Sequence, residues 1–304
     1  MTGCNATSEF TCQSDGSCVS LDLRCDGRPE CQDQSDEEDC KKVVLPDGYR
    51  KYVTPWSDTK ENMTVNVSVV FEVFLEVNEA EQFLKNTMTM TRTWFDRRLT
   101  YHNLKEGKRA NVLSDESKES IWYPKIIFEN IDPSKTSVDR THEYRVIRNK
   151  DAMPIDAPKS DLMNINIFEG SENKLEYSAQ FTYSWKCTYD LRMYPFDTQI
   201  CTMNFGLKDE KGLVLKPENV RFNGKKDELT EYTIQKLSFC TKENGQGLEL
   251  EVILERPLMN SILTLFLPTL FLFIISHLAK VFAEDYMDMV IQVHLTVLLV
   301  LASL

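Results

Sequence analysis

The chain has 304 residues, which is long enough for two or more domains. Its formal net charge of −12 and its isoelectric point near 5.0 argue against a nucleic-acid partner, because phosphates attract basic surfaces. Nine cysteines, six of them within the first forty residues, predict an oxidising, extracellular compartment.

Three Asn-x-Ser/Thr sequons agree with that compartment and are candidate glycosylation sites: Asn5, Asn62 and Asn66. No signal peptide precedes Cys4, although a disulfide-rich segment needs export. We therefore expect the sequence to be incomplete at its start.

Residues 1–41 are too rich in cysteine and too short to form a hydrophobic core, so they need disulfides, and six cysteines allow fifteen pairings. The end of the segment is acidic, with carboxylates at Asp26, Glu30, Asp33, Asp36, Glu37, Glu38 and Asp39. Crowded carboxylates repel one another unless a hard cation binds them, and Ca²⁺ prefers oxygen ligands. The residues predict a calcium-binding module, and the alternative is a solvated acidic face.

Three strings in this segment resemble the LDL-receptor class A module: Phe10-x-Cys12, Cys25-Asp26-Gly27 and Ser35-Asp36-Glu37-x-x-Cys40. The resemblance implies the disulfides Cys4–Cys18, Cys12–Cys31 and Cys25–Cys40. It also implies a structural Ca²⁺ bound by the side chains of Asp26, Glu30, Asp36 and Glu37 and the carbonyls of Leu23 and Arg28. A protein ligand at this module is a further expectation.

Residues 42–256 have the pattern of an antiparallel β-sandwich. Apolar residues alternate with mostly polar ones from Val65 to Leu75, which predicts a long strand with one apolar face. Further strand-like runs occupy residues 87–99, 175–183, 199–205 and 248–254. Many strands with no helical periodicity between them favour a sandwich.

The segment from Cys187 to Cys201 closes a loop whose disulfide would stabilise the fold by about 3 kcal/mol. At its centre, Tyr194-Pro195-Phe196-Asp197 places two aromatic side chains around a rigid proline, and such a tip is expected to press against another surface. The spacing, this centre and Gln199-Ile200-Cys201 resemble the signature loop of the Cys-loop (pentameric ligand-gated) ion-channel family. The strings Trp94–Leu99, Trp122–Pro124 and Cys201–Gly206 extend the resemblance.

This resemblance implies an extracellular sandwich whose loop tip couples ligand binding to a membrane pore. The implied coupling residues are Tyr194, Pro195, Phe196, Asp197 and Arg256, with Asp197 near Arg256 at the membrane junction. It also implies a homo- or hetero-pentamer in the plasma membrane, with the N-terminal domains outside and a small-molecule ligand bound between subunits.

The ligand site of this family is an aromatic box that holds an amine by cation–π attraction. Here Lys208, Glu129 and Thr89 stand at positions where the box has aromatic residues. The candidate ligand-binding residues are therefore Thr89, Phe128, Glu129, Lys208 and Phe239. Either the ligand is not a typical amine, or the chain is an accessory subunit. Cys240 has no vicinal partner and is either a buried thiol or a cross-link to another chain.

The sequence does not predict an enzyme. The histidines, His102, His142, His277 and His294, have no metal-ligand spacing. No nucleophile elbow, phosphate-binding glycine loop or paired-carboxylate motif is found.

Residues 257–304 predict membrane-spanning helices. No charged residue occurs from Pro257 to Ala279, a length that crosses a hydrocarbon core of about 30 Å. A second uncharged run extends from Met289 to Leu304 and is about 24 Å long as a helix, which is too short for a full crossing. We therefore expect the chain to continue beyond Leu304.

Four residues of the second run share one stripe on a helix: Gln292, Thr296, Leu299 and Ser303. A polar stripe is unfavourable in lipid, so it should face protein or water. Packing between helices is one explanation, and the resemblance implies the other, a pore lining with Leu299 as its gate. Acidic residues near the inner mouth, Glu284, Asp285 and Asp288, favour cations, but neither the anion nor the cation motif of the family is present.

Taken together, the sequence predicts a pentameric ligand-gated channel subunit with an N-terminal LDL-receptor class A module. The alternative is an adhesion or endocytic receptor in which the module binds protein and the spans only anchor the chain. The agonist, the conducted ion and the partner subunits are not specified by these residues.

Overall fold

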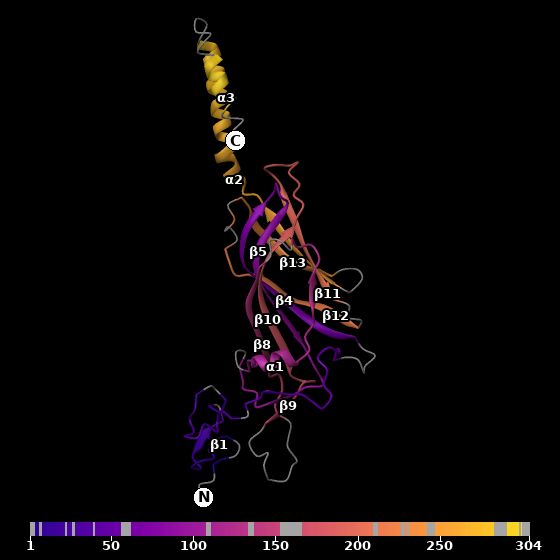
Figure 1. Cartoon of the computed structure of the whole chain (residues 1–304). Coiled ribbons are helices and arrows are strands. Elements are labelled where there is room, and N and C mark those ends of the chain that lie inside the picture. Colours follow the sequence, from indigo (N-terminus) through magenta and orange to yellow (C-terminus); the bar gives the residue numbers. More distant parts are fainter. Residues whose placement is uncertain are drawn as a thin grey trace.

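The computed structural model is elongated, with the N-terminal module at one end, a β-sandwich in the middle and helices at the other end (Figure 1). The residues it describes are 4–5, 8–21, 23–25, 28–38, 40–55, 62–107, 111–132, 137–152, 166–208, 212–225, 229, 231–241, 247–282, 291–297 and 299.

The N-terminal module contains a small hairpin of β1 (Glu9–Thr11) and β2 (Cys18–Ser20). Its core is made of Phe10, Val19 and the half-cystines Cys12 and Cys31, with Leu21 packed against them. So few apolar side chains supply little burial energy, and disulfides supply the remaining stabilisation.

The second domain is a sandwich of two main sheets, as the strand pattern predicts. The first sheet has the order β12 (Leu213–Phe222), β4 (Met63–Asn78), β5 (Phe83–Trp94), β10 (Lys174–Lys186) and β8 (Ser137–Ile147). The second has the order β13 (Thr233–Thr241), β14 (Gly247–Glu255), β11 (Thr198–Leu207) and β7 (Ile126–Phe128). Strands β12 and β4 are parallel, so the first sheet is mixed rather than purely antiparallel.

A third sheet of three short strands lies at the end of the sandwich nearest the module. It comprises β3 (Val43–Val44), β6 (Thr100–His102) and β9 (Ile167–Glu169). The short helix α1 (Asp115–Ser120) is nearby and is capped by Ser114, whose hydroxyl accepts a hydrogen bond from the Ser117 N–H. One of these short strands, β3, comes directly after the module.

Strand β4 shows where the alternation of the sequence holds and where it fails. Val65, Val67, Val69 and Phe71 are all fully buried, as the period of two predicts. The pairing with β5 then shifts between Phe71 and Val73, and an extra residue in a strand reverses which face each later side chain occupies. Consequently Phe74 is buried and Leu75 is 50% exposed, opposite to the prediction.

The core lies between the two main sheets. Trp94 and Trp185 of the first sheet and Phe205 of the second are almost completely buried in one continuous apolar cluster. The predicted strand at 87–99 ends at Trp94, because Asp96 to Leu99 form a turn whose Leu99 N–H donates to the Asp96 carbonyl.

After β14 the chain is helical in three consecutive segments: α2 (Leu258–Ser261), the π-helix η2 (Ile262–Phe266) and α3 (Leu267–Phe282). Pro268 has no N–H to bond to the preceding turn, which explains why the helix widens just before it. Among the described residues, no helix combines the length and apolarity needed to cross a membrane.

Candidate functional site

Three carboxylates of the N-terminal module form a compact cluster. The side-chain oxygens of Glu30, Asp36 and Glu37 lie within 4.8 Å of one another. Asp36 is fully buried, and its two oxygens accept hydrogen bonds from the N–H groups of Glu30 at 2.7 Å and Cys31 at 3.2 Å. Burial alone would raise the pKa of Asp36, but these backbone hydrogen bonds lower it. An ionised buried carboxylate with two neighbouring carboxylates fits a hard cation such as Ca²⁺.

The other expected calcium ligands are less well placed by the structure. Asp26 lies outside the described residues. Leu23 is 42% exposed, and its N–H donates to the Ser20 carbonyl.

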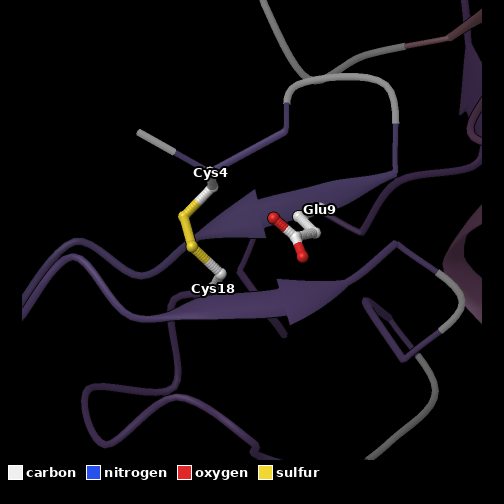
Figure 2. Close-up of side chains that lie close together, drawn as sticks. All are labelled: Cys4, Glu9 and Cys18. Carbon is white, nitrogen blue, oxygen red and sulfur yellow. A yellow bond between two sulfur atoms is a disulfide. The ribbon is translucent and has the colours of Figure 1, made fainter. Parts of the chain in front are cut away.

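Disulfides join Cys4 to Cys18, Cys12 to Cys31, Cys25 to Cys40 and Cys187 to Cys201. Figure 2 shows Glu9 beside the Cys4–Cys18 bond. Because these sulfurs are bonded to each other, they are not thiolates available to a metal. Glu9 instead accepts a hydrogen bond from the Asn5 N–H at 2.8 Å.

The loop between Cys187 and Cys201 has an exposed apolar tip. Phe196 is 70% exposed, Met193 68% and Tyr194 41%. The base of the loop is ordered by Gln199, whose side chain accepts from the Asp190 N–H and donates to the Asp190 carbonyl, both at 2.8 Å. An ordered loop with exposed aromatic side chains is suited to contact another surface.

Beneath this tip, Asp197 and Arg256 form a buried ion pair. Arg256 Nε donates to Asp197 Oδ1 at 2.8 Å, and both side chains are at least 92% inaccessible to solvent. Gln199 Nε2 donates to Asp197 Oδ2 at 2.7 Å. The Arg256 guanidinium lies 4.7 Å from the ring of Tyr194 and 4.4 Å from that of Tyr232.

Two residues of this cluster were not anticipated from the sequence, Glu79 and Tyr232. Arg256 forms an ion pair with Glu79, and the Tyr232 hydroxyl donates to Glu79 Oε1 at 2.5 Å. Glu79 follows β4 and Tyr232 precedes β13, so no local motif connects either residue to the loop. The one sequence feature that could have pointed to this cluster is the charge of Glu79 at the turn after β4.

The electrostatics of the cluster stabilise both charges. Burial would raise the pKa of Asp197, but hydrogen bonds from Arg256 and Gln199 outweigh it and lower this pKa. Burial would lower the pKa of Arg256, and the bonds to Asp197 and Glu79 raise it. The cluster is therefore ionised and connects the loop to the end of β14, where the helices begin.

The candidate ligand residues do not form one site within a single chain. Phe128 and Phe239 pack on either side of Phe205, with ring centroids at 6.1 and 6.4 Å. Glu129 and Lys208 are exposed at the same sheet, where their N–H groups bond to the carbonyls of Asn204 and Lys125. Thr89 is in the other sheet, between buried Met88 and Met90, and its hydroxyl donates to Glu72.

The remaining candidate residues belong to the predicted pore stripe, which the structure describes only in part, and to the three sequons. Residues 291–297 are helical, with Gln292 and Thr296 exposed and the Thr296 hydroxyl bonded to the Gln292 carbonyl at 2.8 Å. Leu299 is 65% exposed, and Ser303 lies outside the described residues. The sequon residues Asn5 and Asn62 are exposed, and Asn66 is half-buried within β4.

Comparison with known proteins gives two family matches. A family described as the neurotransmitter-gated ion-channel ligand binding domain matches residues 40–246. The low-density lipoprotein receptor domain class A matches residues 2–40.

Individual proteins that match the chain share only about a quarter of the aligned residues with it. The chain is 26% identical over 191 residues to neuronal acetylcholine receptor subunit beta-3 of Rattus norvegicus, covering 61% of this chain and 36% of that protein. It is 24% identical over 181 residues to subunit beta-4 of Homo sapiens (59% and 31%) and 26% identical over 174 residues to acetylcholine receptor subunit beta-like 1 of Drosophila melanogaster (57% and 29%). The chain thus spans about a third of the length of these relatives.

Proposed function

The chain belongs to the neurotransmitter-gated ion-channel ligand-binding domain family, with an LDL-receptor class A module at its N-terminus, and we propose that it is a subunit of a pentameric channel opened by an extracellular ligand. Ligand binds between subunits, and the Cys187–Cys201 loop transmits binding to a pore in the plasma membrane. The observation that carries this proposal is the buried Asp197–Arg256 pair, which ties the loop to the strand that leads into the helices.

The proposed membrane segment is 257–279, with a second span from 289 onwards. Its support is the absence of charge between Pro257 and Ala279 together with large exposed apolar side chains on α2 and α3. Met259 is 67% exposed, Phe273 68% and Leu270 55%. So much apolar surface is unfavourable in water and is satisfied by lipid or by neighbouring subunits.

The separation of the ligand candidates supports a site between two chains. Thr89 lies on the outer face of one sheet, and Glu129 and Lys208 lie at the other sheet. In a site between two chains, one subunit therefore contributes Thr89 and the neighbouring subunit contributes Glu129 and Lys208. The Lys208 side chain is exposed at the edge of its sheet, where a ligand can reach its charge. A charged or zwitterionic ligand suits Lys208 and Glu129 better than a quaternary amine does.

The N-terminal module is proposed to hold one structural Ca²⁺ at Glu30, Asp36 and Glu37. A bound Ca²⁺ supplies positive charge that offsets the repulsion among these carboxylates. Asp36 also fixes the local backbone through its bonds to the Glu30 and Cys31 N–H groups.

The decisive experiment is current through membranes that express the complete protein, alone and with related subunits, screened with amino acids, amines and protons. A ligand-gated current supports the channel. Surface expression without any current, combined with protein binding by the module, favours the adhesion receptor instead. Activation of a homomer by micromolar acetylcholine would refute the proposed preference for a charged or zwitterionic ligand.

A further inference from the structure

The guanidinium group of Arg92 is buried in the core of the sandwich. Arg92 lies on β5 between Met90 and Trp94, whose side chains point to the same face of the strand and are almost completely buried. Arg92 itself is 5% exposed. Its guanidinium lies over the ring of Tyr177, the residue directly opposite on β10, at 4.6 Å from the ring centroid. A charged side chain thus occupies a place where the neighbouring positions of the strand are apolar.

The charge of Arg92 is unfavourable in this position. Burial lowers the pKa of Arg92, and the largest opposing effects come from tyrosine side chains, which are neutral at pH 7. The ring centroids of Tyr144 and Tyr177 are 4.4 Å apart, and the ring of Tyr123 packs against both, at 6.3 and 6.1 Å. Replacing buried charges by apolar side chains of similar volume is often neutral or stabilising. Stability alone therefore does not explain an arginine here.

The hydrogen bond of Arg92 holds the backbone that leads into the candidate ligand residues. Arg92 Nη1 donates to the Pro124 carbonyl at 2.9 Å, in a buried position. The carbonyl of the next residue, Lys125, accepts a hydrogen bond from the Lys208 N–H at 3.1 Å. Further along, the Glu129 N–H donates to a carbonyl of β11 at 2.9 Å. Arg92 thus joins the first sheet to the segment that is bonded to the backbone of Lys208 in the second.

We propose that Arg92 is a positioning residue for the ligand site: it fixes residues 124–125 against β5 and thereby sets where Lys208 and Glu129 stand. A guanidinium suits this task, because a hydrogen bond from a charged donor is stronger than one from a neutral donor, and burial strengthens it further. The inference rests on the proposed function, in which Lys208 and Glu129 lie at a junction between subunits. Arg92 acts through the backbone and not on the ligand, since its side chain belongs to the core.

Amide hydrogen exchange in the purified full chain tests this role without a ligand. Arg92→Met removes the donor and leaves an apolar side chain in the core. Exchange of the Lys208 and Glu129 N–H groups should become about tenfold faster, because the segment they bond to loses its anchor, while most of the sandwich exchanges as in the native chain. The unfolding midpoint should stay within about 3 °C of the native value or rise. Arg92→Lys keeps a charged donor and should restore most of the protection.

The matched control is Val69→Ala, which removes buried carbon atoms from β4 of the same sheet. It should lower the unfolding midpoint without a selective increase of exchange at Lys208. If Arg92→Met unfolds, or loses as much stability as Val69→Ala, Arg92 serves stability and the proposal is overturned. Unchanged exchange of Lys208 and Glu129 in Arg92→Met overturns it as well.

Current through the complete channel adds a functional measurement. The probe is the amino acid or amine that opens the native channel in the screen described above. Arg92→Met should raise the concentration for half-maximal current severalfold, and Arg92→Lys should respond near the native concentration. An unchanged concentration in Arg92→Met overturns the role in the ligand site. If no compound opens the native channel, the proposed channel function fails, whereas the exchange data still decide whether Arg92 holds the segment.

Discussion

Arg256 Nε donates to Asp197 Oδ1 at 2.8 Å, across 59 residues of sequence and in a place that solvent barely reaches. Asp197 belongs to the disulfide-closed loop, and Arg256 directly follows β14. The pair therefore ties the loop to the residue that leads into the helices. The covalent ring and the buried charge pair together make this a rigid connection.

Removing one partner of this pair should be strongly destabilising. Asp197→Ala leaves the Arg256 charge buried with Glu79 as its remaining carboxylate, and breaking a buried pair from one side costs about 3–5 kcal/mol. We expect loss of surface expression or of gating, measured by surface labelling and by ligand-evoked current. The double variant Asp197→Ala with Arg256→Met should recover part of the expression, because the only charge left in the cluster is Glu79, which is partly exposed and keeps its hydrogen bond from Tyr232.

Asp190→Ala is the matched control in the same loop. Asp190 forms an exposed ion pair with Arg192 at 2.5 Å, and exposed pairs contribute little to stability. Its expression should stay near the native level. If Asp197→Ala behaves like Asp190→Ala, the buried pair does not carry the coupling.

The Asp197 carboxyl should also give a pH signature. Hydrogen bonds from Arg256 and Gln199 lower its folded-state pKa despite burial, so its contribution is present above the unfolded pKa of about 3.9 and is lost as pH falls through the lower folded value. The difference in unfolding free energy between the native chain and Asp197→Asn should be constant from pH 7 to pH 5 and should narrow below about pH 4. Chemical unfolding over this pH range measures it, and a difference that widens in acid would contradict the assignment.

Calcium removal should loosen the N-terminal module. Without a cation, the carboxylates of Glu30, Asp36 and Glu37 repel one another at close range. We expect a chelator to speed reduction of the Cys25–Cys40 disulfide in the full chain, measured by alkylation and mass spectrometry. Asp36→Asn should be reduced rapidly with or without chelator, whereas Asp15→Asn, outside the cluster, should respond like the native chain. Reduction rates that ignore chelator would argue for a solvated acidic face.

A turn between the sheets depends on Gly170. A Cβ at this position would lie 2.1 Å from the Asp96 carbonyl oxygen and 2.6 Å from that of Leu99. Both neighbours are backbone atoms, which cannot move aside cheaply, so Gly170→Ala should lower the unfolding free energy by about 1–3 kcal/mol or more. Thermal unfolding measures this, with Ser171→Ala as the control, and equal midpoints for the two variants would contradict the predicted clash.

The sequence specified the local features of this fold much better than its long-range contacts. Alternation located the strands, because burial on one face imposes a period of two. It failed after Phe71, where an extra residue reversed the strand, and nothing in the composition of β4 marks that bulge. Glu79 and Tyr232 were missed for a related reason: they join Arg256 across 177 and 24 residues, and spacing in sequence does not reveal such contacts.

The proposed pore can be tested by cysteine substitution in the complete channel. Gln292, Thr296 and Leu299 are exposed on one side of the second helical segment, whereas Val293 and Val297 are half-buried. The half-buried side also carries His294, whose Nε2 is hydrogen-bonded to the Ser276 hydroxyl of α3 at 2.8 Å. Packing against α3 therefore leaves the polar stripe free to face water or another subunit.

Thiol reagents applied to the open channel should change the current at Gln292→Cys, Thr296→Cys and Leu299→Cys, and the same is expected at Ser303→Cys. Val293→Cys and Val297→Cys are the matched controls and should respond least, because the native side chains are half-buried. Comparing reagents of opposite charge then shows whether the pore conducts cations or anions. Faster modification by the cationic reagent indicates a cation pore, which the acidic residues before the segment favour. A uniform response along the helix would assign the stripe to helix packing.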